Sequence, residues 1–280
     1  MKTTPLRTSP APQPTGPQPA VRSLGVVSFL NALPLYETLS GQAGLSIVPA
    51  VPARLHELLA ARRCEAALLP IVSFWQARRR LELISDACIA SDGETMTVRV
   101  FATVPPDKVH RLHVDGDSKT SIVLARLLWL ELYGRRLELL PWPNGGASPG
   151  ERLAAPAGDE VEAVLLIGDK VMRNAPRGFG FEVDLGAAWK HLTGLPFVFA
   201  AWYGPIGGDH AELARMLPAA RDAGVADVQR IAAVYAPRHG WPAAVALAYL
   251  RDTMRYTLTA DMRTAMERFF GLATRHGLLT

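Results

Sequence analysis

The sequence has only two cysteines, Cys64 and Cys88, among its 280 residues. They form no CxxC pair, and none of the seven histidines stands near them at the spacing of a metal site. Disulfide frameworks and zinc sites need more cysteines, or ligands that are closely spaced. These absences exclude a disulfide-stapled scaffold and argue against zinc. We expect both thiols to be reduced and partly buried, as in a cytosolic protein.

Long hydrophobic runs are also missing, because no stretch has the uninterrupted apolar length that crosses a bilayer. Residues 1–20 contain six prolines and no apolar segment of the kind found in signal peptides. This composition predicts a disordered tail rather than a signal peptide. We therefore expect a cytoplasmic protein that makes no contact with a membrane.

Several catalytic signatures are absent too: a P-loop, a GxGxxG fingerprint, a nucleophile elbow and a recognisable Ser-His-Asp set. Lysine and arginine exceed aspartate and glutamate by 30 to 26, which gives a formal net charge of +4. The arginine runs at 62–63, 78–80 and 135–136 lack the interleaved aromatic residues or recognition motif of a nucleic-acid interface. We expect them to be solvated surface, without a nucleic-acid partner, while the mildly positive field favours an anionic small molecule.

What the sequence does contain is an alternation of short apolar runs and amphipathic segments from Leu24 onward. This rhythm predicts an α/β fold built on mostly parallel sheets. Two such units, joined by extended crossovers near 95–105 and 197–205, predict two hinged lobes with a ligand cleft between them. We expect lobe 1 to comprise residues 21–103 and 204–280, and lobe 2 residues 104–203. From His210 onward the pattern predicts helices, with one apolar stripe formed by Leu247, Leu250, Met254 and Leu258.

The first candidate site lies where an apolar strand, 24–27, runs into Ser28 and Asn31. Pro34 follows within the first turn of a predicted helix, where its missing N–H has no cost, and Asn31 can cap that turn. Polar residues at the carboxyl end of a buried strand are where open α/β sheets place ligands. Ser28 and Asn31 are therefore candidate ligand-binding residues.

A second candidate precedes the apolar helix that begins at Ile122 and consists of Ser118, Lys119, Thr120 and Ser121. Three hydroxyl groups and the free N–H groups of a helix N-terminus form a cradle for a carboxylate or a phosphate. Simple capping of the helix by one serine is the alternative interpretation.

Two further polar turns complete the set. Ser91-Asp92-Gly93 lies between strand-like runs, where glycine permits close approach of the backbone to a ligand or merely forms a tight turn. Gly168-Asp169 ends the most hydrophobic strand, and the Asp169 carboxylate either caps the next helix or faces the cleft. A site made of hydroxyls, amides and helix ends binds anions and stabilises developing negative charge.

Four segments, in chain order, resemble the chorismate dehydratases of menaquinone biosynthesis. Residues 28–35 resemble the Ser-Tyr-Leu-Asn-x-x-Pro-Leu opening of that family, and residues 118–121 resemble its Ser-Arg-Thr-Ser helix start. Residues 165–169 and 184–200 are similar to two later signatures, and the resemblance runs from about Leu24 to Leu279. The sequence departs from the family at Phe29, where tyrosine is usual. It also departs at Lys119, which keeps the charge of the usual arginine but loses its bidentate fork.

The resemblance implies a two-lobed periplasmic-binding-protein-like fold of type II. It also implies conversion of chorismate, a dianion, to 3-[(1-carboxyvinyl)oxy]benzoate and water, without a metal or organic cofactor. That reaction is the first step of the futalosine pathway. A non-catalytic solute-binding protein for an aromatic carboxylate and the sister enzyme acting on a cyclic futalosine derivative are the alternatives. We expect a monomer or a homodimer.

Within this interpretation the candidate residues have separate roles. Asn31 and Asp169 are the candidate catalytic residues, although the base is either Asp169 or the enolpyruvyl carboxylate of the substrate itself. The candidate substrate-binding residues are Ser28, Ser91, Gly93, Ser118, Lys119, Thr120, Ser121 and Gly168.

Overall fold

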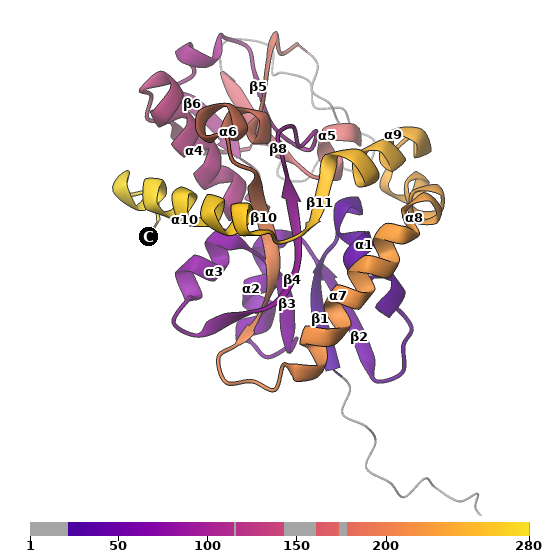
Figure 1. The fold of residues 1–280 in the computed structure, drawn as a ribbon. Helices are drawn as coiled ribbons and strands as arrows, with labels where there is room; N and C mark the ends of the chain where they lie inside the picture. The colour runs from indigo at the N-terminus through magenta and orange to yellow at the C-terminus, as the bar shows by residue number, and fades with distance from the viewer. Residues whose placement is uncertain (1–21, 115, 143–160, 174–177, 280) are drawn as a thin grey trace, which may run out of the picture.

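The computed structural model describes residues 22–114, 116–142, 161–173 and 178–279. The tail expected over residues 1–20 lies outside the described residues. Within the described residues the strands form two mixed sheets, which lie one above the other in Figure 1. We call the first sheet and the helices packed on it lobe 1, and the second sheet with its helices lobe 2.

The first sheet has the strand order β11-β4-β10-β3-β1-β2. Its strands are β1 (Arg22–Val27), β2 (Leu45–Ala50), β3 (Ala66–Pro70), β4 (Leu81–Ser91), β10 (Phe197–Pro205) and β11 (Met254–Thr257). The second sheet has the order β7-β6-β8-β5-β9. Its strands are β5 (Val98–Ala102), β6 (Arg111–Val114), β7 (Glu138–Pro141), β8 (Ala163–Ile167) and β9 (Phe181–Asp184).

The described helices cover both sheets. They are α1 (Leu33–Tyr36), α2 (Pro52–Ala60), α3 (Ile71–Ala77), α4 (Lys119–Tyr133), α5 (Asp169–Arg173), α6 (Leu185–Thr193), α7 (Ala211–Ala226), α8 (Val228–Tyr235), α9 (Ala243–Ala248) and α10 (Ala260–Arg275). Short 3-10 turns are η1 (Leu30–Ala32), η2 (Glu37–Leu39), η3 (Pro106–Lys108) and η4 (Pro237–His239), and η5 (Tyr249–Thr253) is a π-helical turn. No helix in this described part of the chain is long and apolar enough to span a membrane.

The expectation of mostly parallel sheets is only half right. β1 pairs in parallel with β2 and β3, and β6 with β7 and β8, as the alternating pattern predicts. In contrast β10 is antiparallel to β3 and β4, β11 to β4, and β5 to β8 and β9. The chain passes from one sheet to the other along β4 and returns along β10, so these strands run in opposite directions side by side (Figure 1).

The sheets divide the chain a few residues away from the expected lobe boundaries. Strand β5 (98–102) belongs to the second sheet, and β10 (197–205) belongs to the first. The crossings therefore lie over residues 92–97 and 185–196. A run of apolar residues indicates a strand, but it does not show which of two neighbouring sheets the strand joins.

The C-terminal part differs from the expected run of helices. Met254 is the first residue of strand β11, which pairs with β4, so the stripe from Leu247 to Leu258 is not one helical face. Helix α10 begins after Thr259, whose side chain accepts a hydrogen bond from Met262 N, and lies across the waist between the sheets (Figure 1). Fully buried Phe269 on α10 contacts Trp189 of α6 and Phe197 of β10. Burial of this side chain contributes roughly 1.5–3 kcal/mol to the stability of the fold. Its contacts connect the two lobes.

Helix α4 begins at Lys119, before the predicted start at Ile122, and ends at Tyr133. Ser118 caps its N-terminus by accepting a hydrogen bond from Ser121 N, and Gly134 ends it in the left-handed conformation, with φ of 62°. Between these caps Leu124, Leu127 and Trp129 are fully buried. The start of α4 lies at the boundary between the lobes, since Thr120 accepts a hydrogen bond from Val72 N of α3.

Candidate functional site

A small cavity lies where the two sheets meet. Residues from both lobes line it: Val27, Phe29, Asn31, Pro52, Pro70, Ile89, Thr95, Thr97, Val98, Ser118, Ser121, Ile167, Gly168, Phe199, Ala200 and Met254. Its volume is about 50 Å³, whereas a cavity that holds benzene measures roughly 150 Å³. The cavity in this structure is therefore smaller than one that holds a six-membered ring.

The cavity wall is apolar except for a few hydroxyl and amide groups. Among the described residues that line it, none is charged. Its polar side chains belong to Asn31, Thr95, Thr97, Ser118 and Ser121. An anion in this cavity is stabilised by neutral donors and by the N-terminus of α4, whose dipole favours negative charge.

Asn31 lies in turn η1, and its side chain does not cap a helix as the sequence suggested. Its Oδ1 atom is buried and has no partner among the described residues. A buried acceptor without a donor is unfavourable by about 1–3 kcal/mol, so this atom is suited to receive a donor from a ligand.

The four residues at the start of α4 separate into three roles. The Ser118 and Ser121 hydroxyls lie 3.1 Å apart and both residues line the cavity. Thr120 does not line it; its Oγ1 accepts a hydrogen bond from Val72 N of α3, across the lobes, at 3.2 Å. Lys119 is exposed, and its charge adds to burial in lowering the pKa of His56.

Ser28, Ser91 and Gly93 are not among the residues that line the cavity. Fully buried Ser91 donates to Gly93 O at 3.1 Å. A Cβ built on Gly186 would lie 2.4 Å from Gly93 O, so this turn packs directly against the start of α6. The Ser28 amide N–H donates to Ala50 O, which continues the pairing of β1 with β2.

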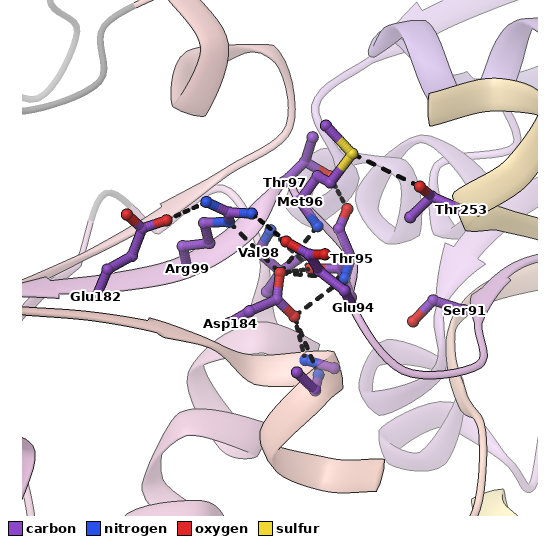
Figure 2. A network of polar contacts seen from close by, with 12 residues as sticks. Ser91, Glu94, Thr95, Met96, Thr97, Val98, Arg99, Glu182, Asp184 and Thr253 are labelled. Atoms are coloured by element: carbon purple, nitrogen blue, oxygen red, sulfur yellow. Dashed lines mark hydrogen bonds and ion pairs between the residues drawn. The ribbon is translucent and has the colours of Figure 1, made fainter. Parts of the chain in front are cut away.

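Neighbouring Thr95 and Thr97 line the cavity instead, and Asp184 holds their segment in place (Figure 2). The Asp184 carboxylate accepts from Thr95 N at 3.0 Å and from Met96 N at 2.8 Å, and it also caps α6. Met96 has φ of 60°, a left-handed conformation that non-glycine residues rarely adopt. Its sulfur accepts a hydrogen bond from Thr253 at 3.5 Å. In the sequence, Asp184 directly precedes the residues of α6, as a capping residue does. Nothing in the sequence indicates that Asp184 also orients residues 95–97.

Asp169 is buried, yet it does not line the cavity. Its carboxylate accepts hydrogen bonds from Leu30 N at 3.3 Å, from Trp241 Nε1 at 2.9 Å and from His239 Nδ1 at 2.7 Å. The carboxylate therefore connects α5 of lobe 2 to η1, to η4 and to the segment after η4 in lobe 1. Gly168, which precedes it, lines the cavity and donates its N–H to Thr97 O at 2.8 Å.

Tyr249 lies behind the cavity wall, in contact with the wall residue Thr97, and the sequence did not reveal this. It is fully buried, and its hydroxyl lies 2.8 Å from the hydroxyl of Thr97. Its ring stacks on Trp241 with 4.9 Å between the ring centroids. Burial raises the pKa of the Tyr249 hydroxyl well above its usual range, so the hydroxyl stays protonated. In the sequence Tyr249 stands in a predicted apolar helix, where a tyrosine carries no signal for a site.

Comparison with known proteins identifies the family. The sequence profile of the menaquinone biosynthesis family matches residues 22–275. The chain belongs to the menaquinone biosynthesis family. A chorismate dehydratase of Thermus thermophilus is 30% identical over 257 residues, which cover 88% of this chain and 93% of that protein. A chorismate dehydratase of Campylobacter jejuni is 26% identical over 183 residues, 63% of this chain and 64% of that protein.

Solved structures place this family member among the periplasmic-binding-protein-like folds. The alkanesulfonate-binding protein of Xanthomonas axonopodis has a TM-score of 0.63 at 15% identity, with 95% of this chain and 96% of that chain covered. A crystal structure of an Archaeoglobus fulgidus protein has a TM-score of 0.70 at 15% identity, with 91% and 97% covered. At this identity the likeness concerns the fold alone, and it agrees with the two lobes and the intervening cavity described above.

Proposed function

We propose that this member of the menaquinone biosynthesis family is a hydro-lyase. It converts chorismate to 3-[(1-carboxyvinyl)oxy]benzoate and water, the first step of the futalosine pathway. Its relatives of known name support this assignment, since both are called chorismate dehydratase. The observation that carries it at the site is Asn31 Oδ1, which has no partner among the described residues and belongs to the same cavity as the two hydroxyls at the start of α4.

The reaction places two demands on the protein. The hydrogen lost from ring carbon C3 is vinylogous to the ring carboxylate, so its removal builds negative charge toward that carboxylate. The Ser118 and Ser121 hydroxyls, together with the N-terminus of α4, supply donors for that charge. Asn31 Oδ1 accepts a hydrogen bond from the C4 hydroxyl, which keeps its proton, and orients this group for departure.

The base is the enolpyruvyl carboxylate of the substrate. Asp169 does not line the cavity, and its carboxylate already accepts from Leu30, Trp241 and His239. A substrate carboxylate that has no charged partner among the described residues of the wall becomes a stronger base, because desolvation disfavours its ionised form. It takes the C3 proton, the C4 hydroxyl leaves with that proton as water, and the ring becomes aromatic.

The test is to incubate purified, chelator-treated protein with chorismate and to follow the product by chromatography and its absorbance. We expect the dehydrated aromatic product without added metal or nucleotide. Protein that binds chorismate and releases it unchanged would instead be a solute-binding protein, the fold of which this chain shares. The Ser121→Ala variant serves as the comparison, because it removes one donor from the cavity wall. Its rate should lie well below that of the unaltered protein.

A further inference from the structure

One carboxylate fastens the two chain segments that cross between the lobes (Figure 2). Asp184 caps α6, where the second crossing begins, by accepting from Gly186 N and Ala187 N at 3.0 Å each. The same carboxylate accepts from the first crossing, from Thr95 N at 3.0 Å and from Met96 N at 2.8 Å. Its side chain is only 10% exposed, and it does not line the cavity. Asp184 therefore acts on the cavity only through the residues that it holds.

The part of the first crossing that Asp184 holds is a strained turn. Met96 has φ of 60°, and Thr97 N donates to Thr95 O at 2.6 Å, across Met96. This hydrogen bond closes a γ-turn, and a γ-turn with positive φ at its centre is rare and strained. Strained backbone persists only where its surroundings enforce it, and it is concentrated at functional sites. Both outer residues of the turn, Thr95 and Thr97, line the cavity, whereas Met96 does not.

Three donors of this turn share Asp184 as their acceptor. Besides the N–H groups of Thr95 and Met96, the carboxylate accepts from Thr95 Oγ1 at 3.1 Å. The Thr95 hydroxyl in turn accepts from Val98 N at 3.1 Å. Because this hydroxyl gives its single proton to Asp184, it has none left to donate to a ligand. The polar groups of Thr95 thus serve to hold the turn.

The first turn of α6 packs against the same residues. A Cβ built on Gly186 would lie 2.3 Å from Thr95 Cγ2 and 2.4 Å from Gly93 O. Glycine at this position therefore lets the main chain of α6 contact the first crossing directly. The position of Thr95 is fixed both by this contact and by the hydrogen bonds to Asp184.

We propose that Asp184 is a positioning residue for the dehydration proposed above, because it holds the turn at Met96 and thereby keeps Thr95 and Thr97 in the cavity wall. This inference rests on the proposed function. Without the carboxylate, the N–H groups of Thr95 and Met96 lose their acceptor, and Met96 relaxes toward ordinary backbone conformations. The two threonines then leave their places in the wall. A displacement of about 1 Å in a site can lower turnover roughly 10²-fold.

The decisive variant is Asp184→Ser. Serine caps helices as well as aspartate does, but its single short hydroxyl replaces a carboxylate that serves both crossings. We expect a folded protein whose kcat for chorismate is lower by roughly 10 to 10², with a smaller change in KM. Glu182→Gln is the matched control, because exposed Glu182 lies on the same strand and pairs with Arg99, the cation beside Asp184. It should keep the kcat of the unaltered protein.

A second substitution separates positioning from a general structural role. Met96→Gly removes the strain of the turn, since glycine adopts positive φ readily. In the Asp184→Ser background it should raise kcat, because the turn no longer has to be enforced. A protein that is merely weakened at the cap of α6 would gain nothing from a more flexible segment.

Gly186→Ala displaces the same segment without altering a charge, and it carries the test if Asp184→Ser does not fold. The added Cβ meets Thr95, so kcat should fall in the same way. Gly271→Ala in α10 is its control, because nothing lies within 4 Å of a Cβ at that position, and it should keep its activity.

An unchanged kcat in Asp184→Ser or in Gly186→Ala would overturn the inference alone, as would a loss in Asp184→Ser that Met96→Gly does not reduce. Absence of turnover by the unaltered protein would overturn the proposed function, and this inference with it.

Discussion

The ring of Phe29 lies directly on Gly168, in the wall of the cavity and across the two lobes. A Cβ built on Gly168 would lie 2.6 Å from Phe29 Cδ2, closer than real Cβ atoms approach a neighbour. Gly168 also has φ of 62°, which favours glycine. Both facts make glycine at position 168 a condition for this contact between the lobes.

The substitution Gly168→Ala should therefore keep the lobes apart. We expect kcat/KM for chorismate to fall strongly and the radius of gyration from small-angle scattering to rise. Gly134→Ala is the control, because Gly134 has the same φ of 62° and no atom within 4 Å of an added Cβ. It should share the backbone strain, roughly 1–2 kcal/mol, and keep its activity. Normal activity in Gly168→Ala would contradict the proposed closure at this contact.

Neighbouring Thr120 and Ser121 should respond differently to loss of their hydroxyls. Thr120→Val leaves the buried N–H of Val72 without an acceptor, which should destabilise the protein by about 1–3 kcal/mol and lower its melting temperature. Ser121→Ala removes a donor from the cavity wall, which should lower kcat by roughly 10²–10³ with a smaller change in stability. Thermal melts and kinetics on the two variants check this contrast. A large loss of kcat in Thr120→Val together with a loss of stability alone in Ser121→Ala would show that these two residues have been assigned to the wrong roles.

Replacement of Asp169 distinguishes the two candidate bases. In Asp169→Asn, one of the donors from Leu30, Trp241 and His239 meets an amide N–H, so we expect a loss of about 1–3 kcal/mol in stability. Because the base is proposed to be the substrate carboxylate, the variant should keep residual turnover and the same acid limb in its pH profile of kcat/KM.

Exposed Asp92, which pairs with Lys190, provides the control Asp92→Asn, which should resemble the unaltered protein. A folded Asp169→Asn protein without turnover at any pH would identify Asp169 as the base instead.

Both cysteines should be inert toward thiol reagents in the folded protein. Burial raises the pKa of Cys64 to about 11 and that of Cys88 to about 12. Since the thiolate is the reactive form, a raised pKa lowers the reactive fraction at pH 8. Labelling at pH 8 should therefore be slow without denaturant and rapid for both thiols in concentrated urea. Rapid labelling of Cys64 in the folded protein would show that its side chain is accessible.

Local signals in the sequence were enough for many elements of the fold. Ser118 and Gly134 bound α4 because caps act on N–H and C=O groups within one helical turn. Pro52 begins α2, and the apolar run before Gly168 is strand β8, because such patterns depend only on neighbouring residues. The motifs that resemble the dehydratase family lie in these same local turns. They led to the family that the comparison then established.

The directions of the strands and the orientations of the side chains at the site could be learned only from the tertiary structure. The antiparallel return of β10 and the strand at Met254 depend on partners far along the chain, which periodicity does not specify. The same holds for the side chains of the site. Asp169 accepts a hydrogen bond from Leu30, 139 residues away along the chain. Tyr249 shares a hydrogen bond with Thr97, 152 residues away. The sequence by itself determined which helix starts and turns carry polar groups. Only closure of the two lobes decided which of those groups face the cavity, because long-range packing and buried hydrogen bonds select one orientation for each.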